Sequence, residues 1–337
     1  MSAAPPARPA LSVLDPTLLP HGHGPAEGLA HSIALARHAE QHGYARVWTT
    51  EHHEHPALAK ATPLLLTYYL ARHTERIRVG TGGVMLPHHA PLAVAEQAAF
   101  LTALHPDRVD LGLGRAPGAS VTAAHALGRG AGPDHAGQLD ALTALLADGD
   151  GAGAPVRAVP VGSPPPAVWL LGSSPWSACE AARRGLPYAF AHHFGGGGAG
   201  DALRLYRERF RPSAALDRPY ALVTANVVAA DTAGEAARQA ASQILAFRSY
   251  HELRPDTLLP PDEAAARLAR TRGSYPATVI CGNPAQVRQA LDHLAAETGA
   301  DELMINTTLH DQTARLRSYR LLADAYASPS AAEGPRS

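Results

Sequence analysis

"RIRVGTGGVMLPHHAPLAVAEQAAFLTALHPDRVDLGLG", residues 76–114, contains a complete strand–helix–strand unit. Short apolar runs at 77–81 and 108–113 predict two buried strands. The segment between them, 91–105, is helical in pattern, with Pro91 in its first turn and Pro106 just beyond its end. A strand followed by a helix and a second strand predicts parallel pairing, because the helix carries the chain back to the starting edge of the sheet.

The same unit recurs along the chain. Six further strand-like runs lie at 11–14, 46–50, 167–171, 187–191, 220–229 and 302–306. Eight strand–helix pairs in 337 residues favour a closed (β/α)8 TIM barrel over an open doubly wound sheet. We expect one barrel over residues 11–326, with disordered terminal segments at 1–10 and 327–337.

Two segments interrupt the rhythm and predict insertions before strands 5 and 8. The first, 148–166, is rich in glycine and proline. The second, 249–277, carries several prolines and one short helical patch. Long loops at the rim of such barrels often act as lids.

Composition narrows the classes of function. Lys and Arg total 29 against 30 Asp and Glu, a formal charge of −1, which argues against nucleic acid as a partner. Two cysteines are too few for a disulfide framework and fit a reducing compartment. The N-terminus lacks a signal-peptide pattern, and no apolar run reaches about 18 residues, so we expect a cytoplasmic protein without a membrane span.

Polar and glycine-rich segments follow five of the predicted strands. They are "TTEHHEH", "TGGVMLPHHAP", "LGLGRAPG", "LLGSSPWSA" and "AFAHHFGGGG". In a (β/α)8 barrel, binding and catalytic residues gather at the C-terminal ends of the strands. The sequence therefore predicts that these five segments meet on one rim.

A candidate anion site follows the fifth strand. Ser173 and Ser174 lie at the strand end, and Ser177 falls in the first turn of the next helix, where free N–H groups attract phosphate. Plain N-capping by Ser174 explains the pattern equally well. Arg115, at the end of the fourth strand, adds the cation that a phosphate site needs. "GLGRAPG" itself fails the dinucleotide fingerprint, because Pro117 occupies the third glycine position.

The histidines admit several interpretations. Adjacent histidines such as those of "EHHEH" are most often exposed loop residues, and glycines such as Gly82 and Gly83 mark either a bulge, a close approach to a ligand, or a flexible strand end. "HGH", with His21 and His23, is similar to the metal-binding pair of barrel hydrolases. That site also needs a lysine at a strand end, whereas the single lysine of the chain, Lys60, stands at a helix start. We therefore predict no metal site.

Four segments carry a resemblance to a known family. "YARVWTTEHHEHPALAKATP" and the stretch from "RIRVGTGGV" to "LGLGRAPG" strongly resemble the bacterial luciferase-like flavin-dependent monooxygenases. "WLLGSSPWSACEAARRGLPYAFAHHF" and "TGADELMINTTLHDQTARLRSYRLLADA" resemble later parts of the same family. The likeness extends from about residue 11 to residue 326, and it is closest to the single-chain oxygenases of natural-product pathways.

The resemblance implies a (β/α)8 barrel that takes up reduced FMN from a separate flavin reductase. With O2, it would form a C4a-peroxyflavin and oxygenate a small organic substrate. By position, His52 matches the catalytic histidine, and Gly82 and Gly83 match a pair joined by a cis peptide behind the flavin ring. Arg115 matches the phosphate-binding arginine. The residues matching those that hold the ribityl chain and the phosphate are Ser173, Ser174 and Ser177. Homodimers are common among the relatives.

One departure and three alternatives accompany this resemblance. Gly114 stands where light-emitting luciferases carry a reactive cysteine, so their aldehyde pocket is not expected here. A deazaflavin-dependent reductase of the same superfamily is one alternative, and a non-catalytic flavin-binding subunit is another, although the presence of both His52 and Arg115 argues against the latter. A metal hydrolase is the third, and it would require bound zinc or a similar ion.

Overall fold

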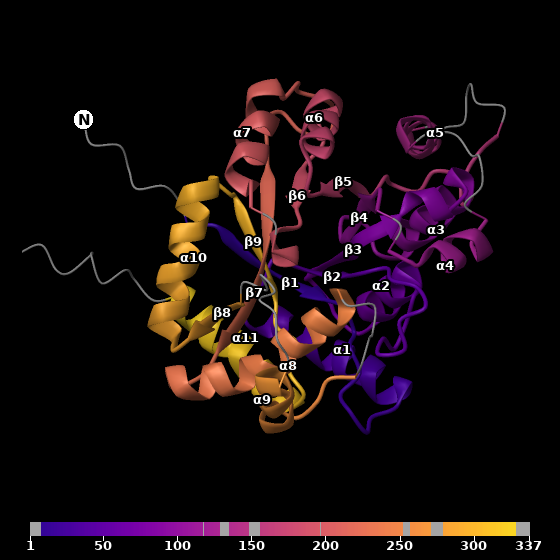
Figure 1. Ribbon diagram of the computed structural model, residues 1–337. Coiled ribbons are helices and arrows are strands. Elements are labelled where there is room, and N and C mark those ends of the chain that lie inside the picture. Colours follow the sequence, from indigo (N-terminus) through magenta and orange to yellow (C-terminus); the bar gives the residue numbers. More distant parts are fainter. Residues whose placement is uncertain are drawn as a thin grey trace, which may run out of the picture.

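Eight parallel strands close into a barrel with the helices packed around its outside (Figure 1), which confirms the predicted (β/α)8 architecture. The computed structural model describes residues 8–116, 118–128, 135–147, 156–195, 197–251, 257–270 and 279–327. The barrel strands follow the order β1, β2, β3, β4, β5, β6, β7 and β9, and β9 pairs with β1 to close it. Their bounds are β1 Ala10–Asp15, β2 Arg46–Thr49, β3 Arg78–Met85, β4 Val109–Gly114, β5 Ala167–Gly172, β6 Tyr188–Phe190, β7 Ala221–Ala229 and β9 Glu302–Asn306.

Proline begins many of the surrounding helices. Six of the described helices have proline as their first residue, where the missing N–H would have no partner in the helix anyway. The helices are α1 Pro25–Gln41, α2 Pro63–Arg72, α3 Pro91–Leu104, α4 Val121–Ala126, α5 His135–Ala147, α6 Pro175–Arg184, α7 Ala199–Arg209, α8 Ala233–His251, α9 Pro261–Arg270, α10 Pro284–Thr298 and α11 Gln312–Ala327, with the 3-10 turns η1 Leu86–His88 and η2 His192–Phe194.

A strand that the sequence patterns did not predict lies between the second insertion and the last barrel strand. This strand, β8 (Val279–Gly282), pairs only with the end of β7 and lies outside the barrel. The predicted helical patch of segment 249–277 is α9, whereas 252–256 and 271–278 lie outside the described residues. Residues 148–155 of the first insertion also lie outside them, as do 1–7 and 328–337 of the predicted terminal segments.

The barrel interior is closed at its N-terminal end by buried charges. Arg46 on β2 donates to Asp110 on β4 at 2.7 Å and to Glu302 on β9 at 2.8 Å. Above them, the rings of Trp48 and Trp169 pack edge to face with centroids 5.1 Å apart. These bulky side chains fill the barrel, so any cavity must lie between them and the C-terminal rim.

None of the helices in the described parts of the chain is both long and apolar enough to cross a membrane.

Candidate active site

A cavity of about 310 Å³ lies at the C-terminal ends of the barrel strands. Trp48, Leu14 and Met304 contribute apolar side chains to its walls. Its size falls within the range of about 300–1,000 Å³ that is usual for ligand pockets. All of the site residues predicted from the sequence line this one cavity, namely His52, Gly82, Gly83, Arg115, Ser173, Ser174 and Ser177.

One end of the cavity is formed by the N-terminus of α6. The side chain of Ser174 caps the helix by accepting a hydrogen bond from Ser177 N at 3.5 Å, so the capping interpretation of this serine also holds. The Ser177 hydroxyl donates to Ser174 O at 2.8 Å. Because a hydroxyl proton rotates to suit its surroundings, the same group could donate to an anion instead. Gly172 leaves room for this serine, since a Cβ there would lie 2.4 Å from Ser177 Oγ.

Arg115 extends from the end of β4 toward this helix. Its guanidinium carbon lies 4.6 Å from the centre of the Trp176 ring, a cation–π contact that positions the side chain. Within the described part of the chain, this exposed guanidinium has no carboxylate partner. An arginine beside hydroxyl groups and the positive end of a helix forms a site suited to a phosphate group.

The wall between the two ends of the cavity is bare backbone. The peptide bond between Gly82 and Gly83 is cis, as the resemblance implied, and the pairing of β3 with β4 shifts register at this point, which fits a bulge, one of the alternatives for this glycine pair. A Cβ on Gly83 would lie 2.6 Å from Gly112 O, and one on Gly82 would lie 3.0 Å from the Trp48 ring. A side chain at Gly83 would therefore require the backbone to shift, and one at Gly82 would require the Trp48 ring to move, so the two glycines leave open backbone on which a planar group can lie.

His52 also lines this cavity, and it follows closely after the end of β2. Its Nδ1 is 3.2 Å from Thr50 Oγ1, which orients the ring. Burial, together with the nearby Lys60 ammonium, which donates to Thr50 O, lowers the pKa of His52 to about 3. The imidazole is therefore neutral near pH 7, with one ring nitrogen able to donate and the other able to accept a hydrogen bond.

A second histidine, His193, faces the same space from the end of β6. Its Nδ1 lies 2.5 Å from Thr224 Oγ1, and burial, with His52 nearby, lowers its pKa to about 3. No sequence pattern distinguished His193 from an ordinary loop histidine. Its position directly after a predicted strand, in "AFAHHF", was the signal that could have identified it.

Glu51 holds the ends of two neighbouring strands together at the rim of the barrel. Its buried carboxylate accepts hydrogen bonds from His53 Nε2 at 2.7 Å, His89 Nε2 at 2.8 Å and Met85 N at 2.9 Å. Burial would raise the pKa of this carboxyl, but these hydrogen bonds outweigh it and lower the pKa. Glu51 thus ties the end of β2 to the end of β3, and no sequence pattern distinguished it from the neighbouring polar residues.

The pattern for a metal hydrolase has no structural counterpart in the described residues. No three side chains of His, Cys, Asp or Glu converge there in a way that could hold a metal ion. Gly114, which stands at the position of the luciferase cysteine, is close to Met85, and a Cβ at Gly114 would lie 2.4 Å from Met85 Cε.

The sequence and the fold are both similar to those of known proteins of one family. The model of the luciferase-like monooxygenase family matches residues 11–302. A luciferase-like monooxygenase of Escherichia coli K12 is 40% identical over 326 residues, covering 94% of this chain and 96% of its own. The crystal structure of apo-MsnO8 has a TM-score of 0.87 and 39% identity, with 95% of this chain and 98% of that chain covered.

A more distant structure shares the fold. It is the oxygenating constituent of 3,6-diketocamphane monooxygenase of Pseudomonas putida, a type II Baeyer–Villiger monooxygenase in complex with FMN. Its TM-score is 0.73 at 18% identity, with 95% of this chain and 98% of that chain covered. A family model that spans most of the barrel, together with relatives that match almost end to end, shows that the chain belongs to the luciferase-like monooxygenase family and is an oxidoreductase of that kind.

Proposed function

We propose that this monooxygenase is the oxygenase of a two-component system. It takes reduced FMN from a separate flavin reductase and uses O2 to add one oxygen atom to a small organic substrate. The observation that carries the proposal is the Arg115 guanidinium at the N-terminus of α6, which has no carboxylate partner among the residues that the structure describes and lines the same cavity as His52. The distant relative in complex with FMN supports the choice of cofactor.

The residues present fit FMN along the length of the cavity. Arg115 and the hydroxyls of Ser173, Ser174 and Ser177 would hold the phosphate and the ribityl chain, and the backbone of Gly82 and Gly83 would support the ring. When bound in its reduced form, FMN supplies the electrons that activate O2. The apolar walls provided by Leu14, Trp48 and Met304 exclude water from the ring end.

His52 acts in this proposal as a neutral hydrogen-bonding group at the ring end. Because burial keeps its pKa near 3, the ring does not carry a full positive charge at pH 7. The contact between Nδ1 and Thr50 Oγ1 orients the ring, and a neutral imidazole carries one N–H donor and one acceptor with which to hold or pass a proton toward the reacting atoms. His193, held by Thr224, would perform a similar orienting role on the other wall.

The proposal is tested by anaerobic titration with FMN, followed by mixing of the reduced complex with O2. We expect FMN to bind more tightly than riboflavin, and the absorbance of oxidised FMN to return slowly in the native protein and quickly in His52→Ala. His125→Ala, which removes an exposed histidine of α4, is the matched control and should behave like the native protein. Binding of a 5-deazaflavin without binding of FMN would instead support the alternative reductase.

The proposed homodimer would cover an apolar surface on α2 and α3. Leu65 and Tyr69 on α2, and Phe100 and Leu104 on α3, are 66%, 41%, 50% and 50% exposed. Residues four apart on a helix share a face, and the two helices are in contact. Such exposed patches favour association between protein surfaces. A substrate from natural-product metabolism rests on the resemblance alone, and a cytoplasmic location rests on the cysteine count and the N-terminal pattern.

A further inference from the structure

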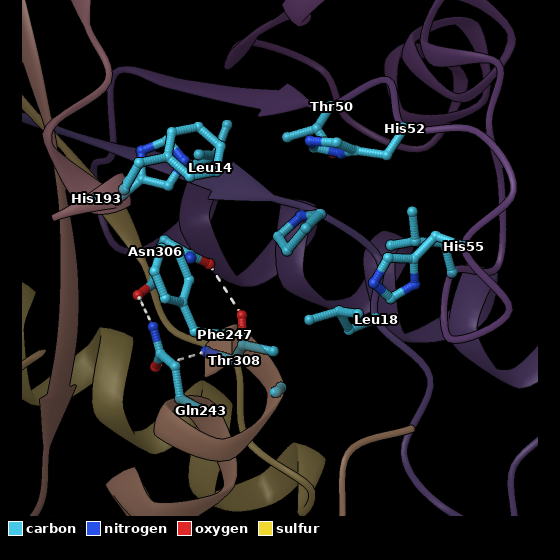
Figure 2. A pocket seen from close by; sticks show the side chains of 14 residues that line it. Leu14, Leu18, Thr50, His52, His55, His193, Gln243, Phe247, Asn306 and Thr308 are labelled. Atoms are coloured by element: carbon cyan, nitrogen blue, oxygen red, sulfur yellow. Dashed lines mark hydrogen bonds between the residues drawn. The ribbon is translucent and has the colours of Figure 1, made fainter. Parts of the chain in front are cut away.

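A second, smaller cavity adjoins the proposed flavin site at its ring end. Its volume is about 80 Å³, and Figure 2 shows the side chains that line it. Leu14, Thr50, His52, His193 and Phe194 line both cavities, whereas no residue of the phosphate end lines the second. A molecule in the second cavity would therefore lie beside the ring and both histidines, and away from Arg115.

The walls of this second cavity are mostly apolar. Leu18 and Leu58 line one side, and Ala246 and Phe247 of α8 line another. Among the described residues that line it, none is Asp, Glu, Lys or Arg. Its three histidines are His52, His55 and His193, and burial lowers the pKa of each, which leaves them neutral near pH 7.

The polar groups at its inner end already bond to one another. Gln243 Nε2 donates to Asn226 Oδ1 at 3.1 Å and to Asn306 O at 3.0 Å, and Gln243 Oε1 accepts from Thr308 N at 3.1 Å. The Thr308 hydroxyl donates to Asn306 Oδ1 at 2.9 Å (Figure 2). With its proton used in this way, the hydroxyl oxygen can still accept a hydrogen bond, and a neutral imidazole of the cavity carries one N–H donor, so the cavity can satisfy one neutral polar group but cannot neutralise a charge.

An ionised substrate would lose its hydration here without gaining a counter-charge. Removing a charge from water into such surroundings is strongly unfavourable unless the charge is paired. A neutral molecule made mainly of carbon atoms gives up little hydration free energy on entering the cavity, and the burial of its apolar surface is favourable. The volume of about 80 Å³ sets the scale of the enclosed part, because a cavity needs about 10–15 Å³ of such space to hold one water, and it therefore suits a group of a few non-hydrogen atoms.

We propose that the reacting part of the organic substrate occupies this second cavity, and that the substrate is a small, uncharged, mainly apolar molecule with at most one neutral polar group. This inference rests on the proposed flavin function for its biological meaning. Its selectivity for neutral molecules is a property of the cavity itself and can be measured separately from flavin binding.

The test uses the FMN-loaded protein with two probes of equal non-hydrogen atom count, pentan-2-one and butanoate. Ligand-observed NMR at pH 7 gives the affinity for each probe. We expect pentan-2-one to bind at least about tenfold more tightly than butanoate. Equal binding of the two probes, or tighter binding of butanoate, would overturn the inference.

Two substitutions on α8 locate the bound probe. Ala246→Phe fills the second cavity without touching the flavin cavity, so it should weaken pentan-2-one binding at least about tenfold and leave FMN binding unchanged. Ala237→Phe makes the same change on the exposed side of the same helix and should alter neither. Pentan-2-one binding that survives Ala246→Phe in a protein that still binds FMN would also overturn the inference. If Ala246→Phe does not fold, Ala246→Leu repeats the test with a smaller side chain.

The experiment distinguishes failure of the flavin proposal from failure of the inference about the substrate. If the native protein does not bind FMN, the flavin proposal fails, and the probe comparison can still be made on the flavin-free protein. If FMN binds and pentan-2-one does not, only the inference about the substrate fails.

Discussion

Replacement of Arg115 by glutamine tests the proposed phosphate site directly. The substitution removes the charge and keeps a side chain able to pack on Trp176. A hydrogen bond to a charged group contributes about 1.5–3 kcal/mol. Because Arg115 is exposed to solvent, we expect the lower part of that range, about 1.5–2 kcal/mol. This corresponds to roughly a 10–30-fold rise in the Kd for FMN.

The assay compares FMN with riboflavin, which has the same ring and ribityl chain but no phosphate. Arg115→Gln should weaken FMN binding by this amount and change riboflavin binding less than about threefold. Binding of FMN should not vanish, because the serine hydroxyls and the α6 N-terminus remain. Arg218→Gln removes an exposed arginine before β7, at the opposite end of the barrel, and is the control. Equal weakening of both flavins, or of neither, would refute the assignment of Arg115 to the phosphate.

Three further predictions concern stability and assembly. Gly112→Ala should destabilise the barrel by about 1–3 kcal/mol in urea unfolding, since its Cβ would lie 2.1 Å from Thr81 O, whereas Gly234→Ala, with nothing within 4 Å, should be neutral or slightly stabilising. Burial holds the pKa of His193 near 3, below its unfolded value near 6.5, so the unfolded chain binds the proton first. The contribution of neutral His193 to the free energy of unfolding is therefore fully present above pH 6.5 and is lost as the pH falls toward 3. The native protein should lose free energy of unfolding between pH 7 and 5.5, and His193→Asn should make this loss smaller by up to about 1.4 kcal/mol. Phe100→Glu combined with Leu104→Glu should convert a dimer into monomers in analytical ultracentrifugation, and an unchanged sedimentation coefficient would contradict the proposed interface.

Local patterns in the sequence were sufficient for the barrel. Its strands are buried on both faces and appear as short apolar runs, and the prolines that begin α3 and α10 mark helix starts that need no tertiary contact. The same patterns failed at β8 because that strand is short and half-exposed, and is specified mainly by its pairing with β7.

The convergence of the predicted site residues also follows from the sequence, once the barrel is accepted, because parallel strands bring all of their C-terminal ends to one rim. The sequence does not reveal the roles of the individual polar residues on that rim. His52, His53 and His193 look alike in the sequence, yet one lies at the cavity beside Thr50, one bonds to the buried Glu51, and one faces the cavity from another strand.

The sequence by itself thus determined the architecture and the rim on which the site lies, since these depend on periodicity and on strand order. Only the tertiary structure decided that two cavities meet beside His52 and His193, and that the smaller one contains no charged group among the described residues that line it. Burial, charge compensation and cavity shape depend on side chains from α8, β6, β7 and β9 together, and contacts between residues so far apart in the chain leave no local pattern in the sequence.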